Sequence, residues 1–136
     1  MATTTATIQL ASSDLTGDAL GLSRASILTK AGFTTGLDQT TGVGRKSTTT
    51  ATEYTLFTAS EYAPLSGTAN KAHKIYLANP STNSTEYFRV EVGGTLIGFI
   101  YAGDWAFIPW AGQGDITITP SEATSMTLEY MLIYES

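Results

Sequence analysis

The sequence predicts an all-β protein, an antiparallel β-sandwich or jelly-roll-like barrel with an extended N-terminal region. Short apolar segments follow one another at regular spacing, separated by glycine, proline and asparagine turn signals, and no convincing long helix interrupts them. Threonine is abundant, and its β-branched side chain suits a pleated, half-exposed surface. In Phe88–Val92, apolar and polar residues alternate as they do in an antiparallel strand with one wet face.

The N-terminal third has the weaker strand signals. Ile8 and Leu10 alternate with polar or small residues, which predicts a short strand ending in a serine- and aspartate-rich turn. The segment from Leu20 to Leu28 fits either a second strand or a helical turn. Residues Gly32 to Thr52 contain four glycines and few large apolar side chains, so we expect a long loop or arm that contacts a neighbouring molecule.

We expect one compact domain overall, in which residues 1–52 form the extended arm region with weak strands and residues 53–136 form the sandwich body. Glu53–Tyr62 fits either a strand or one helical turn, and a turn-like segment follows from Pro64 to Asn70. Ile75–Leu77 is then a strand core that ends in a dense turn signal, which favours a hairpin with the next strand.

The remaining strands carry clearer signals. Gly93 and Gly94 form a two-residue turn that joins the alternating strand to Leu96–Tyr101 and predicts a β-hairpin. Further strands are expected at Trp105–Trp110 and around Ile116 and Ile118. Met126–Tyr134 has large side chains on both faces, so this last strand should be central or shared.

Composition argues against several classes of function. The net charge is -5 and the pI is near 4.6, which offers little to neutralise a phosphate backbone, so direct nucleic-acid binding is not expected. The chain has no cysteine. Its longest apolar stretch, Leu96 to Gly112, is broken by Asp104 and Pro109, so no membrane span is expected. The first residues lack the features of a secretory signal, which predicts synthesis inside the cell.

No catalytic constellation stands out, and we expect neither an enzyme nor a cofactor or metal site. The run Gly42 to Ser47 resembles a phosphate-binding loop only in outline, because Arg45 stands where that motif requires glycine before the lysine. It is more simply a flexible basic loop, in which Arg45 and Lys46 are candidate protein contacts. His73 is the only histidine, and it stands between Lys71 and Lys74, where an exposed and non-catalytic side chain is expected.

Trp105, Phe107 and Trp110 form the most notable cluster of side chains. Aromatic residues in strands normally contribute core packing area, and that interpretation is favoured. If they are exposed, Trp105 and Trp110 become candidate contacts to another protein, or to sugar rings with the help of Asp104.

From Lys74 to Tyr134 the chain has a strand, an Asn-Pro-Ser turn, a second strand, a Gly-Gly turn, and a late Ile-Pro followed by a threonine-rich strand. This pattern resembles small virion proteins of tailed phages, above all capsid decoration (cement) proteins. The threonine-rich opening Met1 to Leu10 and the run Gly36 to Gly42 are similar to structural proteins of marine and cyanobacterial phages.

The resemblance implies a β-sandwich or jelly-roll domain, often trimeric, that binds and stabilises the shell of the major capsid protein. The implied location is the capsid surface of the virion, after assembly in the host cytoplasm. The alternative is a fibre, neck or tail component whose β-sandwich binds a receptor or carbohydrate.

Overall fold

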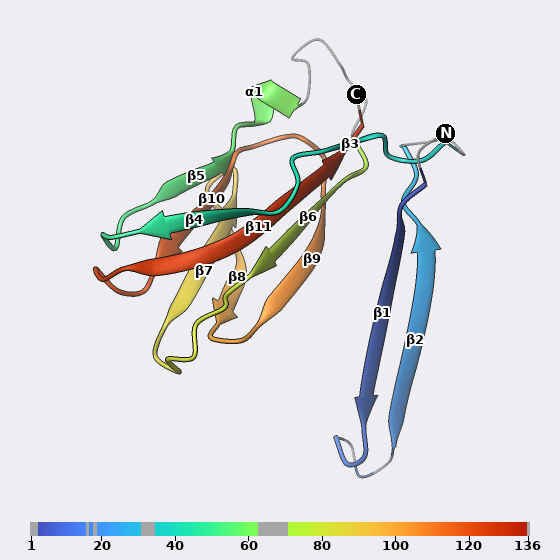
Figure 1. The fold of residues 1–136 in the computed structure, drawn as a ribbon, viewed down its shortest axis with the longest axis horizontal. Coiled ribbons are helices and arrows are strands. Elements are labelled where there is room, and N and C mark those ends of the chain that lie inside the picture. The colour runs from blue at the N-terminus through green and yellow to red at the C-terminus, as the bar shows by residue number, and fades with distance from the viewer. Residues whose placement is uncertain (1–2, 16, 18, 31–34, 63–70, 136) are drawn as a thin grey trace.

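The computed structural model describes residues 3–15, 17, 19–30, 35–62 and 71–135. These residues form two antiparallel sheets packed against each other and a separate two-stranded hairpin (Figure 1). A short helix, α1 (Ala59–Tyr62), follows the fifth strand. In chain order the strands are β1 (Thr5–Ser12), β2 (Leu20–Ile27), β3 (Gln39–Thr40), β4 (Gly44–Thr48), β5 (Tyr54–Phe57), β6 (His73–Ala78), β7 (Tyr87–Val92), β8 (Thr95–Tyr101), β9 (Trp105–Trp110), β10 (Ile116–Pro120) and β11 (Met126–Tyr134).

The body is a sandwich, which confirms the predicted fold class. Its first sheet has the strand order β5-β10-β7-β8. In the second sheet β9 pairs with β6 and β6 with β11, while β3 and β4 both pair with the other edge of β11. The last strand is therefore central, as its large side chains on both faces predicted.

The inward faces of the two sheets share one apolar core. Its buried members come from seven strands, so neither sheet could hide its apolar face alone. They are Phe57, Ile75, Leu77, Phe88, Val90, Ile100, Trp110, Ile116, Ile118, Met126, Leu128 and Leu132.

The hairpin of β7 and β8 confirms the firmest local prediction. Val92 pairs with Thr95 across the turn, and Gly93 and Gly94 have φ values of 56° and 78°. Two successive positive φ angles give the primed turn whose twist matches the flanking strands, and glycine adopts them without a Cβ clash.

The predicted hairpin between the strand at Ile75–Leu77 and the next strand is wrong. The strand does end at the Asn-Pro-Ser turn, but β6 lies in the second sheet and β7 in the first. Asn79 holds this crossover: its amide donates to the carbonyls of Glu86 (3.4 Å) and Ile100 (3.2 Å), and its side-chain oxygen accepts from Ser81 N (3.1 Å). These bonds satisfy a side chain that is only 1% exposed.

The prediction of a long loop from Gly32 to Thr52 is wrong for its described residues, 35–52. β3 and β4 form there and pair with β11, and Leu37 is buried. Edge strands need few apolar side chains because backbone hydrogen bonds to a central strand hold them, which is why composition misled the prediction. The segment Glu53–Tyr62, for which a strand and a helical turn were both considered, forms β5 and then α1. The turn expected from Pro64 to Asn70 lies outside the described residues.

A second, smaller cluster covers part of the outer face of the β9-β6-β11 sheet. Leu28, Leu37 and Ile133 are buried in it, and Ala6, Ala72, Phe107 and Met131 pack against them. Leu28, just after β2, and Leu37, just before β3, are thereby attached to the body.

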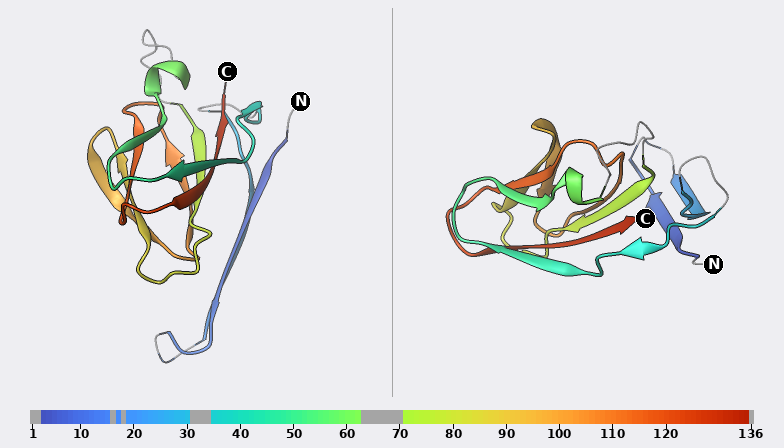
Figure 2. Two further views of the ribbon diagram at one scale, coloured as in Figure 1. Left: turned by 60° about the vertical axis from the view of Figure 1, so that its left-hand side comes forward. Right: turned by 90° about the horizontal axis from the view of Figure 1, so that it is seen from above.

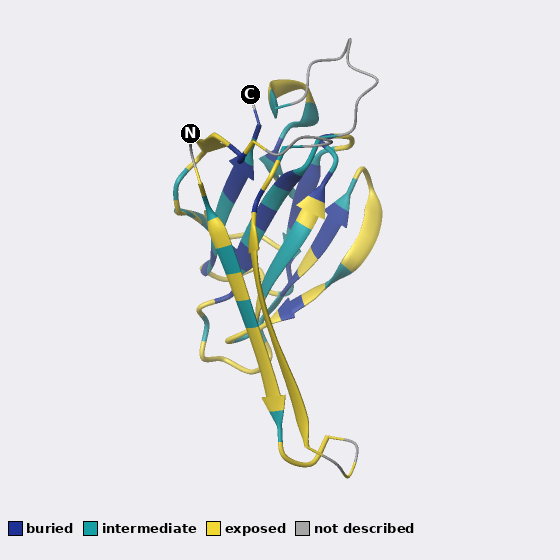
Figure 3. Ribbon diagram, turned by 90° about the vertical axis from the view of Figure 1, so that its right-hand side faces the viewer, coloured by how far each residue is buried: buried dark blue, intermediate teal, exposed yellow. Residues whose placement is uncertain are grey.

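The N-terminal hairpin projects from this attachment as an arm, formed by β1 and β2 (Figures 1 and 2). The expected strand at Ile8 and Leu10 is present, and the segment from Leu20 is a strand rather than a helical turn. Every residue of β2 is exposed, and neither arm strand pairs with a strand of the body (Figure 3).

Replacing Asn79 tests the crossover. Asn79→Ala leaves the carbonyls of Glu86 and Ile100 and the backbone N–H of Ser81 without their Asn79 partner, so we expect it to lower the free energy of unfolding by about 2–3 kcal/mol. Asn83→Ala, at an exposed position in the same connection, should cost less than about 1 kcal/mol. Urea unfolding followed by circular dichroism measures both, and equal losses would contradict the role given to Asn79.

Candidate interaction surfaces

The structure separates the two tryptophans. Trp110 is 3% exposed; its indole N–H donates to Gly114 O (3.1 Å), and its ring lies against His73 and Phe57. Trp105, at the other end of β9, is 54% exposed. The core interpretation therefore holds for Trp110, whereas Trp105 is available to a partner.

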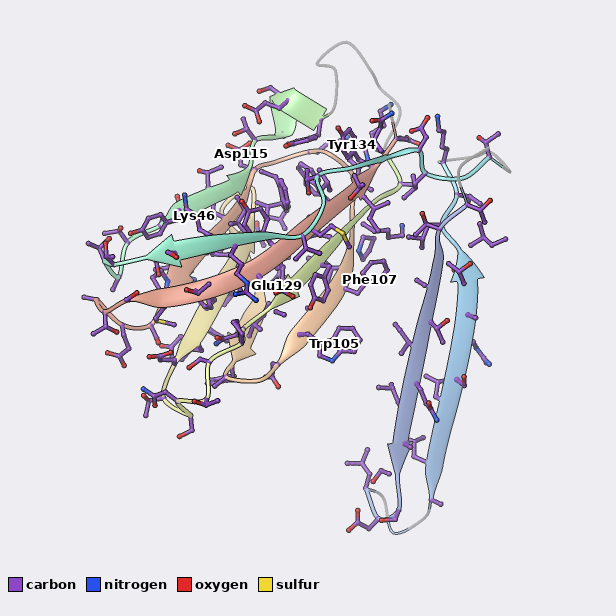
Figure 4. The ribbon with its side chains drawn as sticks, in the orientation of Figure 1. Lys46, Trp105, Phe107, Asp115, Glu129 and Tyr134 are labelled. Atoms are coloured by element: carbon purple, nitrogen blue, oxygen red, sulfur yellow. The ribbon has the colours of Figure 1, made fainter. Side chains whose placement is uncertain are left out.

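Trp105 belongs to an apolar row on the outer face of the second sheet. Phe107 shares its face of β9 and pairs in register with Tyr76 of β6, which pairs in turn with Met131 of β11. The side chains of Phe107, Tyr76 and Met131 are partly buried. Figure 4 shows Trp105 and Phe107 extending from the body on the side where the arm lies. We call Trp105, Phe107, Tyr76 and Met131 the outer aromatic row, in which three of the four side chains are aromatic.

One carboxylate lies beside this row. Glu129 accepts a hydrogen bond from the Tyr76 hydroxyl (3.1 Å), and its other oxygen lies 3.5 Å from the Arg45 guanidinium. Its side chain is partly exposed. The outer aromatic row thus has a negative charge at one border.

Arg45 and Lys46 lie in β4 rather than in a flexible loop, so that part of the prediction is wrong. They are neighbours in an edge strand and their side chains point to opposite sides. Arg45 is exposed and faces Glu129, whereas the Lys46 ammonium lies 5.4 Å from the centre of the Tyr54 ring. Of the two, Arg45 is the more exposed: its side chain is 69% exposed, whereas Lys46 is partly buried.

A second group of aromatic rings lies along β7 and β8, with Phe99 and Tyr101 exposed and Tyr87 partly buried. Tyr87, Phe99 and Tyr101 are in mutual contact, with ring centres 5.2 to 6.4 Å apart. Between the β8 and β9 edges lies an open apolar pocket of about 200 Å³, lined in part by Ile97 and Phe99. This volume is below the range typical of small-molecule sites.

His73 is buried, contrary to the expectation that it is exposed. Its Nδ1 accepts from the backbone N–H of Glu135 (3.3 Å), so the ring proton is on Nε2, which donates to Tyr62 O (3.1 Å). Trp110 and Tyr134 contact the ring on its sides. One nitrogen thus holds the residue after β11, and the other holds the end of α1, against β6.

Asp104 and Asp115 accept hydrogen bonds from backbone N–H groups. The Asp104 carboxylate accepts from Tyr101 N (3.3 Å), and Asp115 accepts from Ala59 N (2.8 Å). In residues 3–15, 17, 19–30, 35–62 and 71–135, no three histidine, cysteine or carboxylate side chains gather as a metal site would require.

The arm exposes large apolar residues that the sequence did not single out as a surface. Leu10, Leu20, Leu22 and Ile27 are all exposed, as is Leu15 near the tip. The alternation around Ile8 and Leu10 was visible in the sequence, but alternation alone does not tell whether an apolar face is covered. The exposure of these residues in the folded chain supplies the missing information.

Comparisons with known proteins identify no relative. No protein-family model matches the chain, and neither a curated protein nor a solved structure matches it. Within the part of the chain that the structure describes, no helix is long and apolar enough to cross a membrane.

Buried His73 predicts a loss of stability in mild acid. Burial is the largest influence on its pKa and lowers it below the usual value near 6.5, against the opposing effect of the Tyr62 carbonyl. The unfolded chain then binds a proton that the folded chain does not, so the contribution is complete above about pH 6.5 and is lost as the pH falls through the lower folded pKa. The free energy of unfolding should decrease from pH 7.5 to 5.5.

His73→Gln removes the titrating group at this position. Its free energy of unfolding, measured by urea titration at several pH values, should vary less between pH 7.5 and 5.5 than that of the wild type, whatever its absolute stability. An unchanged pH slope would show that the imidazole is not the group responsible.

Proposed function

We propose that this protein is a non-enzymatic virion structural protein, a capsid decoration protein that binds and stabilises the shell of the major capsid protein. The observation that carries the proposal is the arm, an exposed hairpin with large apolar side chains that the body leaves uncovered. A two-stranded hairpin is only marginally stable in water, so an arm of this kind gains its stability from a neighbour. That is the behaviour of an assembly subunit.

The rest of the surface supports the same function. The chain has few charges for its size, and its exposed aromatic rings lie on the outer faces of both sheets. Tyrosine and tryptophan at such positions bury a large area and keep a polar edge in contact with water, which suits broad, mostly neutral protein contacts. Arg45 adds one exposed charge at the β4 edge, next to the outer aromatic row.

The decoration proposal places many copies on the capsid surface of a virion, with a homotrimer as the favoured assembly. His73, the single histidine, is committed to core hydrogen bonds, which supports a structural rather than a catalytic role.

Binding to capsids tests the proposal directly. Purified protein should co-sediment with expanded capsids that lack it, and capsids without it should release their DNA at lower temperature or on chelation. Arg45→Gln should weaken binding several-fold, while Arg89→Gln, at a similarly charged site on the other sheet, should not. Failure of the wild type to bind, with no change in capsid stability, would refute the proposal.

Exposure of Trp105 favours a second candidate, a fibre, neck or tail component that binds a receptor or carbohydrate. An exposed indole can stack on a sugar ring, although the adjacent Asp104 carboxylate already accepts from Tyr101 N. A glycan array should then give signals that Trp105→Ala abolishes. Silence of the wild type, or signals unchanged by the substitution, would remove this candidate.

A further inference from the structure

The arm has one apolar face and one polar face. Residues directly opposite each other in an antiparallel pair lie on the same face, and Leu10 pairs with Leu22 while Ser12 pairs with Leu20. Ile8, paired with Arg24, extends this face toward the body. The opposite face contains only small or polar side chains apart from Ile27, namely Thr5, Thr7, Gln9, Ala11, Gly21, Ser23 and Ala25.

At the base of the arm, its apolar face reaches a buried cluster on the body. Ala6 lies on the same face as Ile8 and Leu10, and it packs against the cluster of Leu28, Leu37 and Ile133. Phe107 of the outer aromatic row packs against that same cluster. The apolar face of the arm and the outer aromatic row therefore meet at one buried cluster, at the base of the arm.

Beyond the base the two surfaces separate. Figures 1 and 3 show the arm extending away from the body, with most of its length exposed. Leu10 and Leu22 are 49% and 37% exposed, and Trp105 also remains open. Apolar area thus stays uncovered on both surfaces, around Leu10 and Leu22 on the arm and around Trp105 on the body.

Charge complements this apolar match. Arg24 is the charged side chain on the apolar face of the arm, and within the described residues it forms no ion pair. Glu129, which also pairs with Arg45, borders the outer aromatic row on the body and is partly exposed. An arm laid across the row would bring opposite charges to one border of the contact.

We propose that the arm of one copy packs its apolar face on the outer aromatic row of a second copy, in a closed assembly where each copy gives one arm and receives one. This inference rests on the proposed function only in treating the arm as an assembly element. It names the partner of the arm as the same chain, whereas shell binding concerns a different protein.

The size of the arm favours exchange over a one-way contact. Eight residues per strand give a ribbon about 26 Å long and roughly 10 Å wide, so one docked face hides about 500 Å² when both surfaces are counted. A specific interface needs about 1,000 Å² or more. In a closed assembly each copy takes part in two such contacts, which together hide about 1,000 Å², whereas one arm alone hides half of that.

The mass of the purified full chain in solution is the first test, measured by light scattering after size exclusion. The wild type should form a dimer or trimer at micromolar concentration. Leu10→Ser with Leu22→Ser should raise the dissociation constant by about a hundredfold or more, because both leucines are buried in the contact. The matched control, Gln9→Ser with Ala25→Ser on the other face of the arm, should keep the wild-type mass. A monomeric wild type, or equal effects of the two variants, would overturn the inference.

Disulfide trapping locates the contact, since the chain has no cysteine of its own. A mixture of single variants Leu22→Cys and Trp105→Cys should form a cross-linked heterodimer on mild oxidation, and a mixture of Gln9→Cys and Trp105→Cys should not. The double variant Leu22→Cys, Trp105→Cys should cross-link between chains. If it closes within one chain instead, the arm folds onto its own body and the inference fails.

These outcomes are separable from the capsid test. Self-association without capsid binding would refute the decoration function alone, and a monomer that binds capsids would refute arm exchange alone.

Discussion

Pairing of β11 on both of its edges is the constraint on which the rest of the structure depends. Its inward side chains, Leu128 and Leu132, are fully buried in the sandwich core, while Ile133 is buried on the outer face. On one edge β11 holds β6, and on the other it holds β4 and then β3. A strand that is apolar on both faces and hydrogen-bonded on both edges cannot move without disturbing both clusters.

The position of β11 also determines what lies outside the sandwich. Because β3 pairs with Ile133 and Tyr134, the chain just before it is brought over the outer face of the second sheet, where Leu37 is buried. Leu28, at the end of the arm, joins the same cluster. The arm is thus anchored at its base by apolar packing on β11, and the remainder of its length is left to project.

Local features of the sequence were predictable where local rules decide them. The hairpin at Gly93 and Gly94 could be predicted without the rest of the chain. A two-residue turn that needs positive φ angles sets the pairing of its own two strands. The choice between a hairpin and a crossover after Ala78 depends instead on which sheet the next strand joins. Asn79 marks that crossover through bonds to Glu86 and Ile100, and Ile100 is distant in sequence.

Burial was harder to predict from the sequence than strand location. His73 stands between lysines, yet the alternation of β6 turns it inward, where two backbone groups satisfy it. Residues 35–48 have little apolar content, and they still form strands because β11 offers an edge to pair with. Trp105 and Trp110 occupy the same strand and have opposite environments, which composition could not distinguish.

The low charge of the chain and the exposed arm have a common physical consequence. A contact made by Ile8, Leu10 and Leu22 against aromatic rings gains free energy from removing apolar area from water, with few charges to desolvate. Such a contact depends weakly on salt, since screening acts on charges rather than on apolar area. The small and hydroxylated residues of the opposite arm face keep that side compatible with water while the apolar face is covered. In the proposed exchange, the arm turns its polar face to water and its apolar face to the second copy.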